Sequence, residues 1–125
     1  MLKKVMRDRF IDICRNAMDA DVRTSHTNCR VLEPYFQDLI SLAEPHGDNF
    51  ELKTCFISIV TGDIDAPSET LAYCMRALRF EEVVDASKRK LGDPPDPRWM
   101  NFHRDILHAM NDKVWEDSDM WERLC

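Results

Sequence analysis

The sequence predicts an all-α fold of five or six helices, packed as an irregular bundle or as stacked antiparallel pairs like those of helical repeats. Apolar residues recur at i, i+3, i+4 spacing along most of the 125 residues. Prolines and glycines fall between these stretches, where helices must end. A single segment would also suit a strand, but one strand alone would leave its backbone groups unpaired. No period recurs well enough to indicate a repeat protein.

The length and the composition fit one domain over residues 1–125. With 44% hydrophobic residues, the chain can build a core of ordinary size. After Trp115 the helical pattern ends. Residues 116–125 form an acidic and aromatic tail whose mobility the sequence leaves open.

Three helices are predicted in the first half of the chain. The first covers about residues 2–19, where an apolar stripe follows helical spacing. The second ends before Pro45, and Pro34 either kinks it or lies in the first turn of a helix beginning near Glu33. The third covers residues 49–61. The apolar positions of these helices are Leu2, Val5, Met6, Phe10, Ile13, Cys14, Ala17; Val31, Leu32, Tyr35, Phe36, Leu39, Ile40, Ala43; and Leu52, Cys55, Phe56, Ile59, Val60.

The segment over residues 49–61 is the one that would also suit a strand, because residues 56–60 are rich in aromatic and β-branched side chains. Asn49 is a suitable N-cap, and Gly62 is a suitable C-terminal stop. These two residues favour a helix.

The second half of the chain predicts three more helical stretches. Asp65 can cap a helix with Pro67 in its first turn, and a further stripe follows with a tight bend, or no break, at Arg79. Three prolines in residues 93–97 then end the helix. The last helix opens near Pro97. The residues expected to face inward are, for these three stretches in order, Leu71, Cys74, Met75, Leu78; Phe80, Val83, Val84, Ser87, Leu91; and Trp99, Phe102, His103, Ile106, Ala109, Met110.

Composition excludes several classes of function. Three glycines are too few for a Gly-rich phosphate-binding loop. The net charge of −6 disfavours nucleic acid and anionic lipid as main ligands. The N-terminus alternates charged and apolar residues, unlike a signal peptide, and no run of 18 residues lacks charge as a bilayer span requires. We therefore expect a cytoplasmic protein without a membrane or nucleic-acid ligand.

The five cysteines are odd in number and widely spaced, which indicates reduced thiols and not a disulfide framework. Cys14, Cys55 and Cys74 lie on apolar stripes, where a thiol packs as a small hydrophobe. Cys29 lies one helical turn after His26, so a thiol nucleophile with a histidine base is one alternative. No glycine-rich turn or orienting acid accompanies this pair.

The last helix carries a second candidate for chemistry. Asp105, His108 and Asp112 share one side of it at i, i+3, i+7 spacing. We expect this side to face solvent, opposite Phe102 and Ile106, so a solvated polar stripe is favoured over a metal site. The histidines show no CxxC, HxxxH or HExxH spacing. No metal, cofactor or catalytic residue is therefore predicted.

The only basic run is Lys88-Arg89-Lys90, at the end of a predicted helix. Asp85 can neutralise it through i, i+3 and i, i+4 pairing, and cations favour a helix C-terminus. We expect a solvated helix end and no nucleic-acid readout.

Acidic side chains concentrate in the second half of the chain. Residues 1–62 hold 8 basic and 9 acidic side chains, whereas residues 63–125 hold 9 and 14. Exposed tryptophans among acids would provide anchors and electrostatic steering for a basic partner; the alternative is that the tryptophans cover the bundle. The candidate partner-binding residues are Glu81, Glu82, Asp85, Asp112, Trp115, Glu116, Asp117, Asp119 and Trp121.

These observations favour a non-enzymatic protein-binding module, of the kind of a small acidic inhibitor or immunity protein that docks a basic, nuclease-toxin-like protein. Two alternatives stay open. One is a small hydrolase or thiol enzyme using His26 and Cys29 or the Asp105, His108, Asp112 side. The other is a helical scaffold or adaptor.

Overall fold

The computed structural model describes residues 2–24, 29–46 and 50–111, and over these residues the protein contains helices and connections but no strand. The all-α prediction is therefore confirmed, and residues 50–61 are helical. No described helix is long and apolar enough to cross a bilayer. The elements are α1 (Leu2–Arg23), the 3-10 helix η1 (Cys29–Leu32), α2 (Glu33–Ala43), the 3-10 helix η2 (Glu44–His46), α3 (Phe50–Thr61), α4 (Thr70–Leu78), α5 (Glu81–Leu91) and α6 (Pro97–Ala109).

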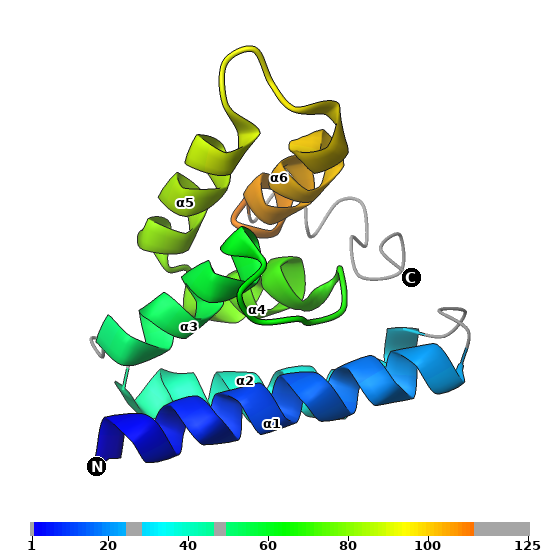
Figure 1. Cartoon of the computed structure of the whole chain (residues 1–125), viewed down its shortest axis with the longest axis vertical. Helices are drawn as coiled ribbons and strands as arrows, with labels where there is room; N and C mark the ends of the chain where they lie inside the picture. Colours follow the sequence, from blue (N-terminus) through cyan, green and yellow to red (C-terminus); the bar gives the residue numbers. More distant parts are fainter. Residues whose placement is uncertain (1, 25–28, 47–49, 112–125) are drawn as a thin grey trace.

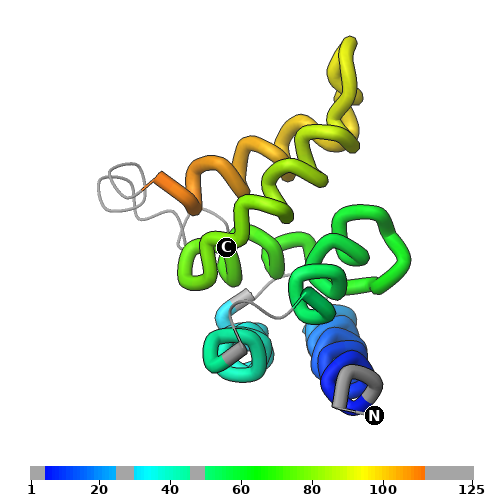
Figure 2. Tube along the Cα trace, turned by 90° about the vertical axis from the view of Figure 1, so that its left-hand side faces the viewer, coloured from blue at the N-terminus to red at the C-terminus, as the bar shows by residue number. Residues whose placement is uncertain are grey.

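The described helices stack in two columns of three. In one column α3 contacts α1 on one side and α5 on the other, and in the second column α4 contacts both α2 and α6. Figure 1 shows α1 beside α2 at one end of the stack and α5 beside α6 at the other, and the turned view in Figure 2 shows the same levels. The described helices therefore form a bundle in which pairs of helices stack on one another.

A row of aromatic rings runs through the first column. The Phe10 ring of α1 meets the Phe56 ring of α3 edge to face, with centroids 4.9 Å apart, and Phe56 meets Phe80, at the start of α5, at 5.9 Å. In the second column Phe36 of α2 contacts Tyr73 of α4 at 5.2 Å. Burying each phenylalanine stabilises the fold by about 1.5–3 kcal/mol, so this packing holds the levels together.

Left-handed residues separate the helices. Gly62 ends α3 at φ +91°, and Gly92 follows α5 at φ +76°. Arg79 has φ +54° and divides α4 from α5, so the chain takes the tight bend of the two predicted alternatives. Few non-glycine residues adopt this conformation. The Arg79 Nη1 donates a hydrogen bond to the carbonyl of Met110 at 3.4 Å, which joins the bend to the end of α6.

Two predicted boundaries change in the structure, and the alternative left open at Pro34 is decided. The first helix continues to Arg23, because Ala20 is buried one turn beyond the predicted stripe. Pro34 lies in the first turn of α2 and does not kink it. The prediction that Asp65 caps the fourth helix is wrong. That helix begins at Thr70, since Ile64 and the Pro67 ring are buried and hold the preceding residues as a loop against the core.

Candidate functional site

Three of the nine predicted partner-binding residues lie in the described part of the chain. Glu81, Glu82 and Asp85 occupy the first half of α5, and all three are exposed. These three acids therefore lie together at the surface of one helix. The other six lie outside the described residues: Asp112, Trp115, Glu116, Asp117, Asp119 and Trp121.

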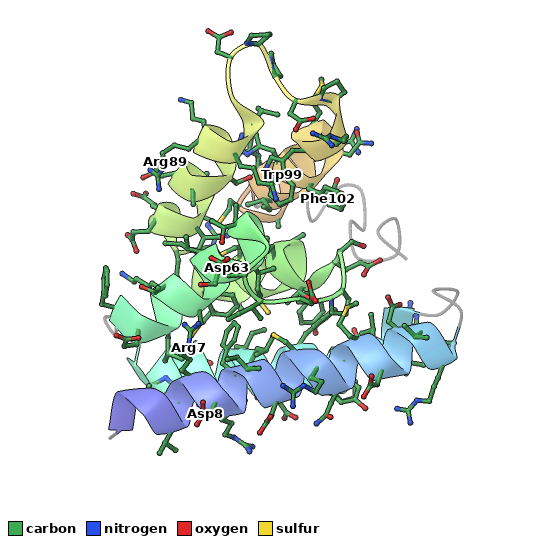
Figure 3. All side chains as sticks on the ribbon, viewed as in Figure 1. Arg7, Asp8, Asp63, Arg89, Trp99 and Phe102 are labelled. Atoms are coloured by element: carbon green, nitrogen blue, oxygen red, sulfur yellow. The ribbon has the colours of Figure 1, made fainter. Side chains whose placement is uncertain are left out.

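Beside these acids a groove of about 360 Å³ runs between α3 and α5. We call it the α3–α5 groove; its lining residues are Phe50, Lys53, Ile57, Glu82, Asp85 and Arg89. Figure 3 shows Arg89 projecting from α5 on the outer side of the molecule. The groove therefore combines an apolar floor with charges of both signs.

Phe50 is the most exposed large apolar residue in the described structure, with 77% of its surface accessible. It stands at the first position of α3, and its ring has no aromatic partner among the described rings that pack together. Exposed aromatic side chains at the rim of a groove are typical anchors for a binding partner, because they bury a large area on contact.

Only some of the charged side chains in and beside the groove form ion pairs. Lys53 Nζ lies 2.9 Å from Glu82 Oε2 and 5.3 Å from the centre of the Phe80 ring, so this lysine is held against the protein. Within the described chain no ion pair joins Glu81, Asp85 or Arg89 to another residue. Two acids and one arginine therefore stand available at the surface.

Sequence reasoning missed Phe50. The predicted inward stripe of α3 begins at Leu52, and Phe50 does not belong to it. A signal was present: Phe50, Lys53 and Ile57 share i, i+3, i+7 spacing, which puts an aromatic and an aliphatic residue on one side of the helix away from the main stripe. Such a second apolar strip beside charges indicates a partner surface or a further packing contact.

The structure describes neither of the two alternative chemical sites completely. His26 and the Cys29 side chain lie outside what the structure describes, as does Asp112. The expectation that Asp105 and His108 face solvent is wrong, because both are partly buried, and Asp105 lines a pocket together with Phe102 and Ile106. α6 packs against α4 as well as α5, so more of its circumference is covered than the apolar spacing indicated. Among the described residues no cluster of His, Cys, Asp and Glu is arranged to hold a metal ion.

The prediction for Cys14, Cys55 and Cys74 is confirmed: all three are free thiols buried in the core. Burial raises the pKa of Cys14 to about 12, and it also raises the pKa of Cys55 and of Cys74. At Cys55 the neighbouring Arg7 partly offsets this rise. Because the thiolate is the nucleophile, we expect these cysteines to react slowly in the folded protein.

A serine and a histidine meet between α5 and α6, a contact that the sequence did not indicate. Ser87 Oγ lies 2.8 Å from His103 Nδ1, and the Trp99 indole donates to Ser87 Oγ at 2.9 Å and to the Ser87 carbonyl at 3.1 Å. We assign His103 as neutral, with Nδ1 accepting from the hydroxyl. Ser87 is wholly buried, so this network joins two helices and offers no nucleophile to a substrate.

The basic run at the end of α5 is not simply a solvated helix end. Lys90 Nζ donates to the carbonyl of Val60 at 2.6 Å and lies 4.2 Å from the centre of the Trp99 ring. Lys90 therefore links α5 to the end of α3 and to α6. Lys88 and Arg89 are exposed, as predicted.

Comparison with known proteins found no match to this chain among protein-family models, curated proteins or solved structures.

Proposed function

We propose that this protein is a non-enzymatic binding module that docks a basic protein on the α3–α5 groove and the acidic first half of α5. The observation that carries the proposal is Phe50, a large aromatic residue left 77% exposed beside the groove. A folded domain gains nothing from exposing such a ring to water, whereas a partner that covers it gains its burial.

The charge around Phe50 supports a basic partner. Glu81 and Asp85 lie one helical turn apart on the exposed side of α5, and Glu82 lies between them. The whole chain carries a net charge of −6, which accelerates association with a cationic protein. A small acidic inhibitor or immunity-type protein acts in this way: it binds a basic nuclease-like toxin in a fixed ratio and blocks its cationic surface. Asp112, Trp115, Glu116, Asp117, Asp119 and Trp121 complete the proposed contact set.

Affinity capture from the native source, compared between variants, tests the anchor. Phe50→Ala should release a partner that the wild-type protein retains, with affinity reduced about thirtyfold if truncation costs about 2 kcal/mol. Val22→Ala is the matched control, since Val22 is an exposed apolar residue on α1, away from the groove. If Phe50→Ala and Val22→Ala retain the same proteins in the same amounts, the groove is not the interface.

Charge reversal tests the acidic surface separately. Once the partner is purified, Glu81→Lys with Asp85→Lys should slow its association and flatten the salt dependence of the rate. Asp8→Lys with Asp12→Lys reverses two exposed acids at the same spacing on α1 and should change the rate much less. Equal effects of the two double variants would reduce the role of the acids to net charge alone.

The predicted tail contribution has its own variants. Replacing Glu116, Asp117 and Asp119 with lysine should slow association, whereas Trp115→Ala should speed dissociation by removing an anchor. Each variant must show the same melting curve as the wild-type protein, so that a change in binding does not reflect unfolding. If these variants stay folded and bind as the wild type does, the interface is confined to α3 and α5.

A further inference from the structure

A second pocket, separate from the α3–α5 groove, lies where α6 crosses the start of α4. Its volume is about 200 Å³, and we call it the aromatic pocket. The walls that matter here are Ile59, Leu71, Trp99, Phe102, Asp105 and Ile106. Ala66, Ser68 and Ala72 also line it, and their small side chains leave the space open opposite the two aromatic rings. Figure 3 shows Trp99 and Phe102 together on α6.

The aromatic wall is held in place before any ligand binds. The Trp99 indole donates to Ser87, and the Lys90 ammonium lies over its ring, so neither the ring nor its polar nitrogen is free to turn. The Phe102 ring packs beside Trp99, with centroids 5.2 Å apart, yet 37% of Phe102 remains exposed. A rigid aromatic wall loses little entropy when a flat apolar group stacks on it.

Asp105 is the only charged side chain among the described residues that line this pocket. Its side chain is 24% exposed, and Arg104, at 3.4 Å, is the one cation paired with it in the part of the chain that the structure describes. Arg104 is the next residue along α6 and its side chain is 58% exposed, so the pair is weak and readily exchanged. An ammonium group on a ligand can therefore take a carboxylate oxygen of Asp105 at small cost.

The volume of the pocket limits the size of the ligand. A cavity of about 150 Å³ lined by aliphatic side chains holds one benzene molecule, and drug-sized ligands need about 300 Å³ or more. A pocket of about 200 Å³ thus accommodates one ring and a short chain. The apolar floor of Ile59, Leu71 and Ile106 suits the ring, and the acid suits a cation.

We infer that the aromatic pocket binds a small arylalkyl ammonium compound, with its ring among Trp99, Phe102 and Ile106 and its ammonium group on Asp105. This inference does not depend on the proposed function, because no residue that lines the pocket belongs to the proposed partner-binding set.

Titration with 2-phenylethylamine, followed by NMR of the Trp99 indole N–H, tests this site without a partner protein. For about nine non-hydrogen atoms we expect a dissociation constant of about 0.1–1 mM. 2-Phenylethanol has the same ring and chain but no charge, and it should bind about tenfold more weakly, because a charge-assisted hydrogen bond is lost. Trp99→Phe assigns the indole signal.

Variants decide whether Asp105 is the recognition group. Asp105→Asn should weaken binding of the amine about tenfold and leave the alcohol unchanged, so that the two ligands become equal. Ser68→Leu, at an exposed position of the rim, should block both ligands by filling the pocket. Asp8→Asn is the matched control for an exposed acid outside both the pocket and the proposed partner surface, and it should change nothing.

Four results would overturn the inference. The amine and the alcohol could bind the wild-type protein equally, the preference for the amine could survive in Asp105→Asn, or neither ligand could shift the Trp99 signal at about 10 mM, well above the affinity expected for a ligand of this size. Sensitivity to Asp8→Asn instead of Asp105→Asn would move the amine to the α1 surface and would equally reject the aromatic pocket.

Discussion

Two phenylalanines on the same helix should respond to truncation in opposite ways. Phe50 and Phe56 both belong to α3, but Phe50 is 77% exposed and Phe56 is 0% exposed. Phe56→Ala leaves a cavity and removes the ring contacts to Phe10 and Phe80, which should cost about 3–5 kcal/mol. Phe50→Ala removes no buried contact, and its free energy of unfolding should stay within about 0.5 kcal/mol of wild type.

The intermediate substitution Phe56→Leu separates ring geometry from volume. Each of the two aromatic contacts contributes about 0.5–1.5 kcal/mol beyond buried area, so this variant should lose about 1–3 kcal/mol. Since a domain of this size is stable by about 5–15 kcal/mol, all three variants should still fold at room temperature.

Urea denaturation followed by far-ultraviolet circular dichroism measures these differences, with the slope of the free energy against urea compared between variants. A loss above about 1 kcal/mol in Phe50→Ala would show that this ring packs in the fold, and it would remove the main support for the α3–α5 groove as a partner surface. A loss below about 1 kcal/mol in Phe56→Ala would refute the aromatic row as the core of the first column.

Three further predictions concern the folded protein alone. Maleimide should label Cys14, Cys55 and Cys74 slowly until denaturant is added, because these thiols are buried and burial raises their pKa values. Rapid labelling of one of these thiols in the native protein, seen by mass spectrometry, would contradict this. Desolvation and the nearby Lys88 lower the pKa of His103 from 6.5, so the contribution of His103 to stability is complete above pH 6.5 and is lost as the pH falls through the folded-state pKa. NMR titration of His103 should therefore give a midpoint below pH 6.5. His103→Gln should make the stability depend less on pH between pH 6.5 and that midpoint. Circular dichroism should show a helical spectrum that EDTA leaves unchanged, and a loss of helicity would point to a structural metal.

The sequence by itself determined which segments are helical and, for most of the apolar stripes, which side of the helix is buried. Val5 and Phe102 are exceptions, since they were predicted to face inward but are 63% and 37% exposed. Helical spacing places Phe10, Phe36 and Phe56 inside, and local signals such as Pro34 and Gly92 place the ends of helices close to where the structure has them. Burial of the three thiols followed from the same spacing. These properties depend on neighbours within a few residues, which a single chain displays directly.

Only the tertiary structure decided which helices contact each other, and therefore which residues lie together at the surface. Phe50 and Asp85 line one groove although 35 positions separate them, since α5 packs on α3. Asp105 was expected in solvent, and the crossing of α6 over α4 placed it in a pocket instead. Lys90 lies in the helix end that was expected to be solvated, but its ammonium group donates a hydrogen bond to the Val60 carbonyl. Periodicity reports the side of a helix that is apolar, but it carries no information on which partner covers that side or how far the cover extends, because those depend on contacts between residues distant in the chain.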